Sequence, residues 1–367
     1  MTLHPLIGHE QAQRELASAV SRGTLPQVIA LVGPAGVGKQ RLALWLAQLL
    51  LCEQPGADGR ACGACRGCLQ VAGLAHPDLH WIVPVLRPKA GEADKQVEEL
   101  GDLMAQAIAE RRERPFYAAP EGMAGHFVAT ARLIQRQAAL TPAMGRRKVF
   151  IIAEADRLVP QESSPDAANA LLKLLEEPPA DTVFVLTTAD LNALLPTIRS
   201  RSVPIRLGRL TDSQVEQFLR QAVEPAPGAQ ALAELVRRAA GAIGQAAGMA
   251  DERDKAREAA HRILEAVTAG APARAERVLK QGPFAARGEF TETLEALAET
   301  LADASRQAAG AQPRESLPRA LARPLSPEAL VSATESVMRA RDEAQGNVNP
   351  QLILAVLADD LAEALCG

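Results

Sequence analysis

The chain has 367 residues, of which 47% are hydrophobic and 3% aromatic, and its formal net charge is −4. This length is too great for one small domain and predicts two or three domains. The scarcity of aromatic residues disfavours an aromatic-rich β-sandwich and favours helices. The slightly negative charge excludes a DNA-binding polycation, so contact with DNA would require a local patch or a partner.

The N-terminal residues 1–5 lack the basic start and apolar core of a signal peptide. The longest apolar stretch, residues 42–51, is interrupted by Gln48 and is too short to span a bilayer. We therefore expect a cytoplasmic protein with no membrane partner. In that compartment the five cysteines are expected to be thiols or metal ligands rather than disulfides.

The first 210 residues alternate short apolar runs with helical patterns. The runs lack polar alternation, which predicts strands of a parallel sheet that is covered on both faces. They span residues 27–32, 80–83, 148–153, 182–187 and 203–207. The pattern predicts an α/β, doubly wound domain over residues 1–208. Two segments break it: an insertion at about 88–125, with a charged helix over 93–114 and a loose tail, and a short loop at 161–166.

After Leu210 the strand signals stop. Thr211 and the residues after it are typical of a helix N-cap, and a helix is expected from there to the break at Pro225, Pro227 and Gly228. Further helices are expected over 229–240 and from about 244 to 267. We place a small helical domain at 209–252 and an all-α domain at 253–367. Breaks are expected at 270–272, 282–283 and 310–327.

A phosphate-binding loop follows the first strand and opens a helix. Gly33, Gly36 and Gly38 allow backbone N–H groups to turn toward a polyphosphate, and Lys39 adds a full positive charge. A chance glycine-rich turn is the alternative. Nucleotide binding by this loop, as ATP or ADP, is possible.

Both usual magnesium ligands are missing. A working loop has Ser or Thr where this chain has Gln40, because the hydroxyl binds Mg²⁺. The second ligand is normally an Asp after a later strand, and here Ala153 occupies that place, followed by Glu154. Mg²⁺ binding is therefore in doubt, and hydrolysis should be slower by orders of magnitude.

Four cysteines form a tight cluster. Their spacing is C-x₉-C-x₂-C-x₂-C, and four thiolates are the right number to complete a tetrahedral zinc site. They are Cys52, Cys62, Cys65 and Cys68. We expect a structural zinc module over residues 52–68, with an iron–sulfur cluster as the alternative. His76 is a rival ligand that more simply precedes a strand.

Several of these segments resemble the clamp loader of bacterial DNA polymerase III, an AAA+ family. The resemblance rests on five stretches and covers most of residues 6–210. They are Ile7–Glu10, the phosphate loop with the cysteines after it, Lys148–Leu158, Asn169–Pro179 and Leu194–Ser202. It implies an AAA+ domain, a helical lid at 209–252 and a helical collar at 253–367 that holds a hetero-pentamer together.

Departures from the family pattern point to its delta-prime subunits rather than to its ATPase subunits, gamma and tau. These are Gln40, Ala153 and Gln245. At the position of Gln245 the family usually has Arg. The family's arginine finger, which reaches a neighbour's ATP, corresponds to Arg201. A planar, permanently charged guanidinium suits that role. Two alternatives remain: Arg201 is a surface arginine without this role, or Arg199 is the functional arginine.

The resemblance implies a stator in DNA replication. The chain would support ATPase subunits and a delta subunit while the complex loads a sliding clamp onto primed DNA. Whether it is an enzyme is left open: its own ATPase activity is not expected, although it would be part of a DNA-directed DNA polymerase holoenzyme. Two alternatives remain, an active gamma/tau-like ATPase and a zinc-containing AAA+ adaptor outside replication. The basic residues 146–148 are expected to form a solvated turn, with a DNA-facing patch as the alternative.

Overall fold

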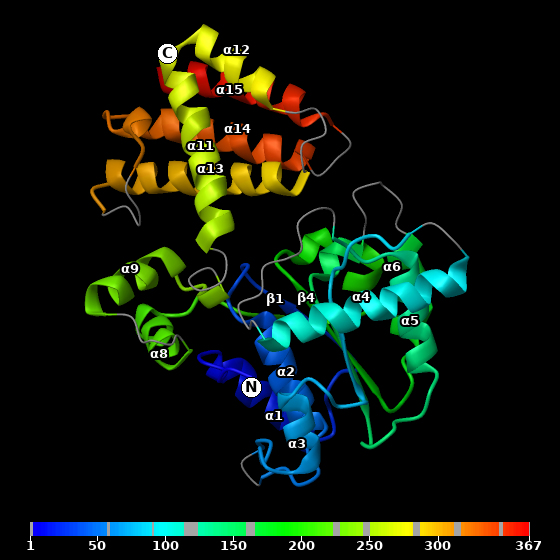
Figure 1. Ribbon diagram of the computed structural model, residues 1–367. Coiled ribbons are helices and arrows are strands. Elements are labelled where there is room, and N and C mark those ends of the chain that lie inside the picture. The colour runs from blue at the N-terminus through cyan, green and yellow to red at the C-terminus, as the bar shows by residue number, and fades with distance from the viewer. Residues whose placement is uncertain are drawn as a thin grey trace. The chain divides into compact units, whose positions relative to one another are not determined.

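The computed structural model describes residues 3–56, 59–89, 92–113, 124–158, 166–222, 228–244, 250–281, 287–311, 317–344 and 348–366. The chain divides into two compact units, one of residues 1–120 with 124–248 and one of residues 249–367 (Figure 1). Within the described ranges, no helix is both long enough and apolar enough to cross a bilayer.

A five-stranded parallel sheet forms the centre of the first unit. Its strands are β1 (Val28–Val32), β2 (Leu79–Ile82), β3 (Lys148–Ile152), β4 (Thr182–Thr188) and β5 (Val203–Arg206). Their order is β2-β3-β4-β1-β5. Every residue of β1, β3 and β4 is buried, so both faces of the sheet are covered. The predicted α/β class and all five predicted strands are confirmed, with ends that differ by one or two residues.

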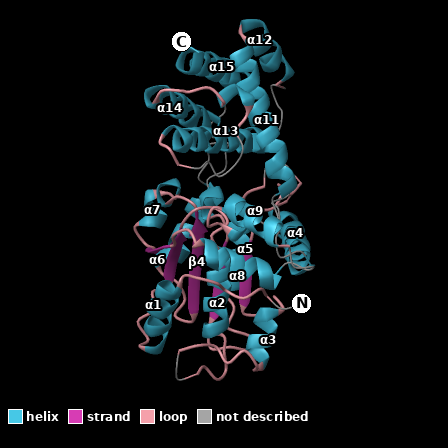
Figure 2. Cartoon of the chain, turned by 90° about the vertical axis from the view of Figure 1, so that its left-hand side faces the viewer, coloured by secondary structure: helices cyan, strands magenta, loops and turns pink. Residues whose placement is uncertain are grey.

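Helices and short 3₁₀ turns cover this sheet (Figure 2). They are α1 (Glu10–Ser21), α2 (Lys39–Leu50), α3 (Arg66–Ala72), α4 (Ala93–Glu113), α5 (Val128–Ala138), η1 (Ala155–Leu158), α6 (Asp166–Glu176), η2 (Leu191–Ala193) and α7 (Pro196–Arg199). Helix α2 packs against β1, β3 and β4, and α5 contacts both α4 and α6. The leucines of α2 bury into the sheet, which fixes the phosphate loop at its start.

The helix of the predicted insertion is part of the main core. Helix α4 matches the predicted helix, and its Val97, Leu100 and Met104 are buried in the same hydrophobic cluster as the sheet. The guanidinium of Arg111 lies 5.5 Å from the ring centroid of Trp81 in β2. The predicted loose tail beyond residue 113 and the short loop at 161–165 fall outside the described residues.

Two further helices of the first unit, α8 (Asp212–Ala222) and α9 (Ala229–Ala239), share a small core of their own. Thr211 begins α8 as predicted: its hydroxyl accepts from the Gln214 N–H at 3.3 Å, and its own N–H donates to the Gln214 side chain at 3.0 Å. This reciprocal capping gives hydrogen-bond acceptors to two backbone N–H groups, those of Thr211 and Gln214, and fixes where the helix starts.

The second unit is all helical, as predicted. Its elements are α11 (Ala250–Ala269), α12 (Ala271–Lys280), α13 (Arg287–Ala308), η3 (Arg319–Leu321), α14 (Pro327–Ala344) and α15 (Pro350–Cys366). Gly270, with φ of 105°, allows the sharp break between α11 and α12 that was expected there. Helices α11, α13, α14 and α15 bury a continuous core of leucine, alanine and valine. The predicted break at 282–283 lies outside the described residues.

Candidate functional site

The phosphate loop connects β1 to α2, as predicted from sequence. Gly36 and Gly38 have φ values of 77° and 100°, which L-residues with side chains rarely adopt. A Cβ on Gly33 would lie 2.4 Å from the carbonyl oxygen of Leu207, the residue after β5, so this close approach also requires glycine. These glycines let the loop turn tightly into the N-terminus of α2, where backbone N–H groups favour an anion.

Lys39 closes the loop onto itself. Its ammonium group donates to the carbonyl oxygens of Gly33 at 2.6 Å and of Pro34 at 2.8 Å. Burial lowers the pKa of Lys39 to about 8, against the opposing charges of Asp156 and Glu154. A phosphate group that entered the loop would compete with these two carbonyls for the ammonium group.

Two segments from elsewhere in the chain contact the loop. The imidazole Nε2 of His9, within the stretch Ile7–Glu10, lies 2.7 Å from the carbonyl oxygen of Val37. The N–H of Gly244 donates to the carbonyl oxygen of Gly36 at 2.9 Å. A Cβ on Gly244 would be 2.9 Å from the Gly36 Cα, so this approach requires glycine. The next residue, Gln245, lies outside the described residues.

The two magnesium positions carry no hydroxyl and no carboxylate. Gln40 is the second residue of α2, and Ala153 follows β3 with its side chain fully buried. Glu154, the next residue, is paired with Arg157, and its N–H donates to the Thr187 hydroxyl at 3.1 Å. Neither position therefore offers the hydroxyl or carboxylate oxygen with which a phosphate loop usually holds Mg²⁺, although Gln40 has an amide oxygen.

One acidic group near the loop was missed in the sequence. Asp156, in the turn η1 after β3, is the larger of the two acidic influences that raise the pKa of Lys39, ahead of Glu154. The signal was present, because Asp156 lies two residues beyond Glu154 in the stretch already tied to the loop. It shows that the Lys39 ammonium lies in an acidic surrounding, which favours its charged form.

The four cysteines come together as predicted. The Sγ atoms of Cys62 and Cys68 are 3.9 Å apart, those of Cys52 and Cys65 are 4.0 Å apart, and all four lie within 4.8 Å of one another. A tetrahedral zinc ion with Zn–S bonds of about 2.3 Å holds its sulfurs about 3.8 Å apart. The thiol geometry therefore fits a single tetrahedral metal ion.

Local backbone geometry prepares these thiols. Cys65 caps the N-terminus of α3, and its sulfur accepts from the Cys68 N–H at 3.4 Å. The N–H groups of Ala64 and Cys65 lower the pKa of Cys62 to about 6. Burial raises the pKa of Cys68. Backbone donors aimed at sulfur stabilise thiolates, which are the form that binds a metal.

Glycine and a histidine complete the surroundings of the cysteine cluster. A Cβ on Gly67 would lie 2.3 Å from the Leu51 carbonyl oxygen, so the chain can pass there only without a side chain. His76 is not a member of the cluster: its Nδ1 accepts from the Asp78 N–H at 3.1 Å. This contact, made just before β2, fits the interpretation of His76 as a residue that precedes a strand.

Arg201 follows α7 and is held by three partners in its own unit. Its Nη1 donates to the Thr197 carbonyl at 2.7 Å and to the Ser200 hydroxyl at 3.2 Å. Its Nη2 pairs with the carboxylate of Glu176, the last residue of α6. The alternative finger, Arg199, instead donates to the Asn192 side chain at 2.8 Å.

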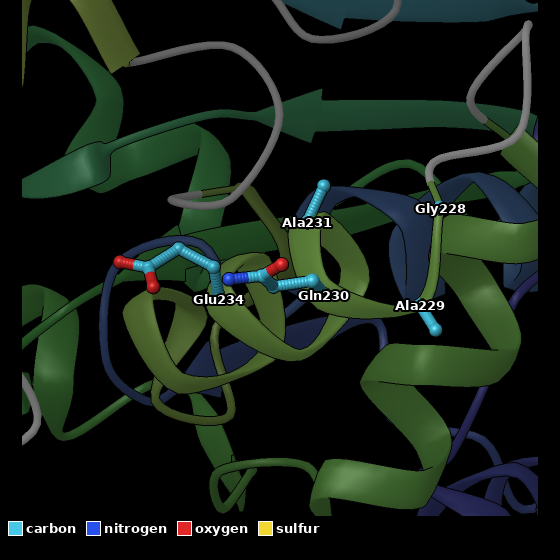
Figure 3. A pocket seen from close by; sticks show the side chains of 5 residues that line it. All are labelled: Gly228, Ala229, Gln230, Ala231 and Glu234. Atoms are coloured by element: carbon cyan, nitrogen blue, oxygen red, sulfur yellow. The ribbon is translucent and has the colours of Figure 1, made fainter.

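The pocket in Figure 3 lies at the start of α9 and contains none of these residues. Its lining is Gly228, Ala229, Gln230, Ala231 and Glu234. The Glu234 carboxylate is paired with Arg237 at 2.7 Å. Small side chains and one engaged carboxylate provide no converging polar groups, so this pocket is not a candidate site.

Comparison with known proteins finds one family. The family described as "DNA polymerase III, delta subunit" matches residues 8–211. The delta' subunit of DNA polymerase III from Pseudomonas aeruginosa is 33% identical over 267 residues, which are 73% of this chain and 60% of that protein. The delta' subunit from Bacillus subtilis is 29% identical over 211 residues, 57% of this chain and 51% of that protein.

A relative with another subunit name matches as well. The tau subunit of DNA polymerase III from Escherichia coli is 30% identical over 254 residues, 68% of this chain and 33% of that protein. The matched part of this chain thus spans at most 60% of the length of these relatives. The family match ends at residue 211, so the site residues lie within it, and the helical second unit lies beyond it.

Proposed function

Because the chain belongs to the DNA polymerase III delta-subunit family, we propose that it is a delta-prime-type subunit of a bacterial clamp loader. It acts as a stator that does not hydrolyse ATP and that supplies Arg201 to a neighbouring ATPase subunit. The observation that carries the proposal is an intact phosphate loop whose two magnesium positions hold Gln40 and Ala153. Such a loop can bind phosphates through Lys39 but lacks the metal that stabilises charge during hydrolysis.

The partners follow from this role. The chain assembles with gamma/tau ATPase subunits and a delta subunit in a hetero-pentamer, and meets the sliding clamp and primed DNA through that complex in the cytoplasm. Exposed apolar side chains on the second unit support an assembly surface there, since contiguous apolar exposure marks interaction sites. They include Leu279 on α12 and Leu352 and Val356 on α15.

The domain limits are part of the proposal. Three separate hydrophobic cores support an AAA+ domain at 1–208, a lid at 209–252 and a collar at 253–367. The contact between Gly244 and Gly36 ties the lid to the phosphate loop, so a nucleotide in the loop would affect how the lid sits.

We assign the cysteine cluster to a structural zinc ion. Cys52, Cys62, Cys65 and Cys68 converge closely enough for one ion. An iron–sulfur cluster attaches its cysteines to different irons and so spreads the sulfurs farther apart. Zinc would fold the loop at 52–68, which has little core of its own.

One observation favours the alternative of an active ATPase: Asp156 and Glu154 both lie near enough to Lys39 to raise its pKa. Glu154 is, however, paired with Arg157, and no hydroxyl follows Lys39. The stator is therefore the better account.

The test is assembly followed by activity. The purified chain is mixed with its cognate gamma/tau and delta subunits and passed over a sizing column. Coelution as one complex is expected. Replacement Arg201→Ala should leave coelution intact and lower DNA-stimulated ATP hydrolysis of the complex by at least tenfold, because an arginine finger contributes several orders of magnitude. Failure to coelute would contradict the assignment.

A further inference from the structure

Glu176 and Arg201 come from two sequence stretches that the chain brings together. Glu176 ends α6, and Arg201 follows α7, 25 residues later. Helix α6 contacts α7, so the pairing is built into the packing of two helices. Both side chains are partly exposed, at 32% for Arg201 and 43% for Glu176. The pair is thus at the surface, and the contact between α6 and α7 brings its two residues together.

The hydrogen bonds of Arg201 leave a defined part of its guanidinium unused. Arginine has five N–H donors. Its Nη1 donates to Thr197 and Ser200, and one N–H of Nη2 donates to Glu176. Within the described residues, the Nε–H and the second Nη2 N–H have no partner. Two donors on adjacent nitrogens are what a bidentate grip on phosphate oxygens requires.

The position of Glu176 indicates that the pair is more than a chance surface contact. A carboxylate at the last residue of a helix faces the negative end of the helix dipole, which disfavours it. The Arg201 guanidinium supplies the opposing charge that makes this position tolerable. The neighbouring Arg199 has no such partner and bonds to the neutral Asn192 amide.

The geometry points to Glu176 as a positioning residue for Arg201: it fixes the guanidinium so that its free Nε–H and Nη2 N–H edge meets phosphate oxygens of a nucleotide held by the adjacent subunit. This inference rests on the proposed function, since it needs Arg201 to act in trans. An unrestrained arginine loses rotamer entropy on docking, and prior fixation removes part of that loss. Positioning of this kind affects kcat, because a small misplacement of a catalytic group slows the reaction strongly.

In this role the carboxylate provides the oxygen acceptor that holds the Nη2 group of Arg201. A carboxylate close to a phosphate would repel it, so a neutral acceptor at the same place should serve as well. Glu176→Gln keeps an oxygen at that place, whereas Glu176→Ala removes it. Glu177→Ala is the matched control, because Glu177 is the adjacent exposed glutamate and is not part of the Arg201 contacts.

The experiment measures kcat and KM for ATP in the complete complex with gamma/tau and delta subunits and saturating primed DNA. For Glu176→Ala, kcat should fall roughly tenfold while KM stays nearly unchanged, because the finger still reaches the site but is misplaced. Glu176→Gln should restore most of kcat, and Glu177→Ala should match the unaltered complex. Each complex is first checked for assembly on a sizing column.

The outcomes separate this inference from the function it rests on. If Arg201→Ala lowers kcat and Glu176→Ala leaves it unchanged or raises it, the positioning role is wrong and the stator role stands. Equal losses in Glu176→Ala and Glu176→Gln would also overturn the positioning role, since the acceptor alone would not suffice. An unchanged kcat in Arg201→Ala would overturn both.

Discussion

The guanidinium of Arg157 is paired with the carboxylate of Glu154, with 2.8 Å between Nε and Oε2. Glu154 has φ of 49°, in a region that residues with side chains adopt uncommonly. The Glu154 carboxylate thus already has a cationic partner three residues away. The residue before it, Ala153, has no side-chain oxygen. The ion pair with Arg157 leaves the Glu154 carboxylate already engaged by a cation of its own segment.

Restoring both missing ligands should restore the response to the metal. In the double variant Gln40→Thr, Ala153→Asp, Mg²⁺ is expected to tighten ATP binding by about tenfold, or ~1.4 kcal/mol. Mg²⁺ should change ATP binding little in the unaltered chain and in each single variant, because one ligand alone does not fix the ion. Isothermal titration with MgCl₂ or EDTA measures this. Equal Mg²⁺ dependence in the unaltered chain would contradict the account.

The charge of Lys39 should set the pH dependence of nucleotide binding. Since burial lowers the pKa of Lys39 to about 8, its ammonium is charged below that pH and neutral above it. ATP affinity should therefore fall as the pH rises from ~7 to ~9, and the fall should flatten in Lys39→Arg, whose guanidinium keeps its charge. Fluorescence titrations with a labelled nucleotide across that range measure it. A parallel decline in Lys39→Arg would mean that another group titrates.

The cysteine cluster should contain about one zinc ion per chain. Cys65→Ser is expected to lose the zinc and to lower the melting temperature by several degrees, because the metal stabilises the loop around it. Cys366→Ser is the control, since Cys366 lies at the end of α15 outside the cluster. Elemental analysis and thermal unfolding give the result. Iron with visible absorbance, or zinc retained in Cys65→Ser, would refute the assignment.

Asp78 should stabilise the first unit in a pH-dependent way. Its carboxylate accepts from the N–H groups of Ala143, Met144 and Gly145, at 2.5, 2.8 and 2.7 Å. Burial acts to raise the pKa of Asp78, but the three N–H donors together hold it below its ordinary value. The stabilisation is therefore present above about pH 4 and lost as the pH falls further.

Replacement Asp78→Asn should lower the free energy of unfolding by about 1–3 kcal/mol at pH 7, because one oxygen acceptor is lost among buried donors. The difference from the unaltered chain should shrink below about pH 4. Urea unfolding at several pH values measures it, with the exposed Asp102→Asn on α4 as control. A difference that grows on acidification would contradict this explanation.

The features predicted correctly from sequence are those that short stretches determine. Strands β1, β3 and β4 are mostly apolar runs, and the cysteines lie close together in the chain, so both follow from local pattern. Glycine spacing likewise predicted the phosphate loop. The family resemblance added Arg201, which no local pattern distinguishes from Arg199.

The features that were missed depend on tertiary contacts. Residues 146–148 were expected in a solvated turn, with a DNA-facing patch as the alternative; Arg146 is exposed in the turn before β3, but for Lys148 both interpretations are wrong, because it is 2% exposed and donates to the Ala138 carbonyl at 2.6 Å. Its ammonium satisfies carbonyls at the end of α5, a helix whose distance from β3 the sequence does not reveal. The Glu176–Arg201 pair was missed for the same reason, because it joins two motifs that were considered separately.

The central claim is that this chain does not turn over ATP by itself. The most direct test is Mg²⁺-dependent ATP hydrolysis by the purified chain alone, with primed DNA present. We expect a rate no higher than the background without protein, since Gln40 and Ala153 lack the hydroxyl and the carboxylate that usually hold the metal. Robust turnover that disappears in Lys39→Ala would contradict the claim and would identify the chain as an ATPase in its own right.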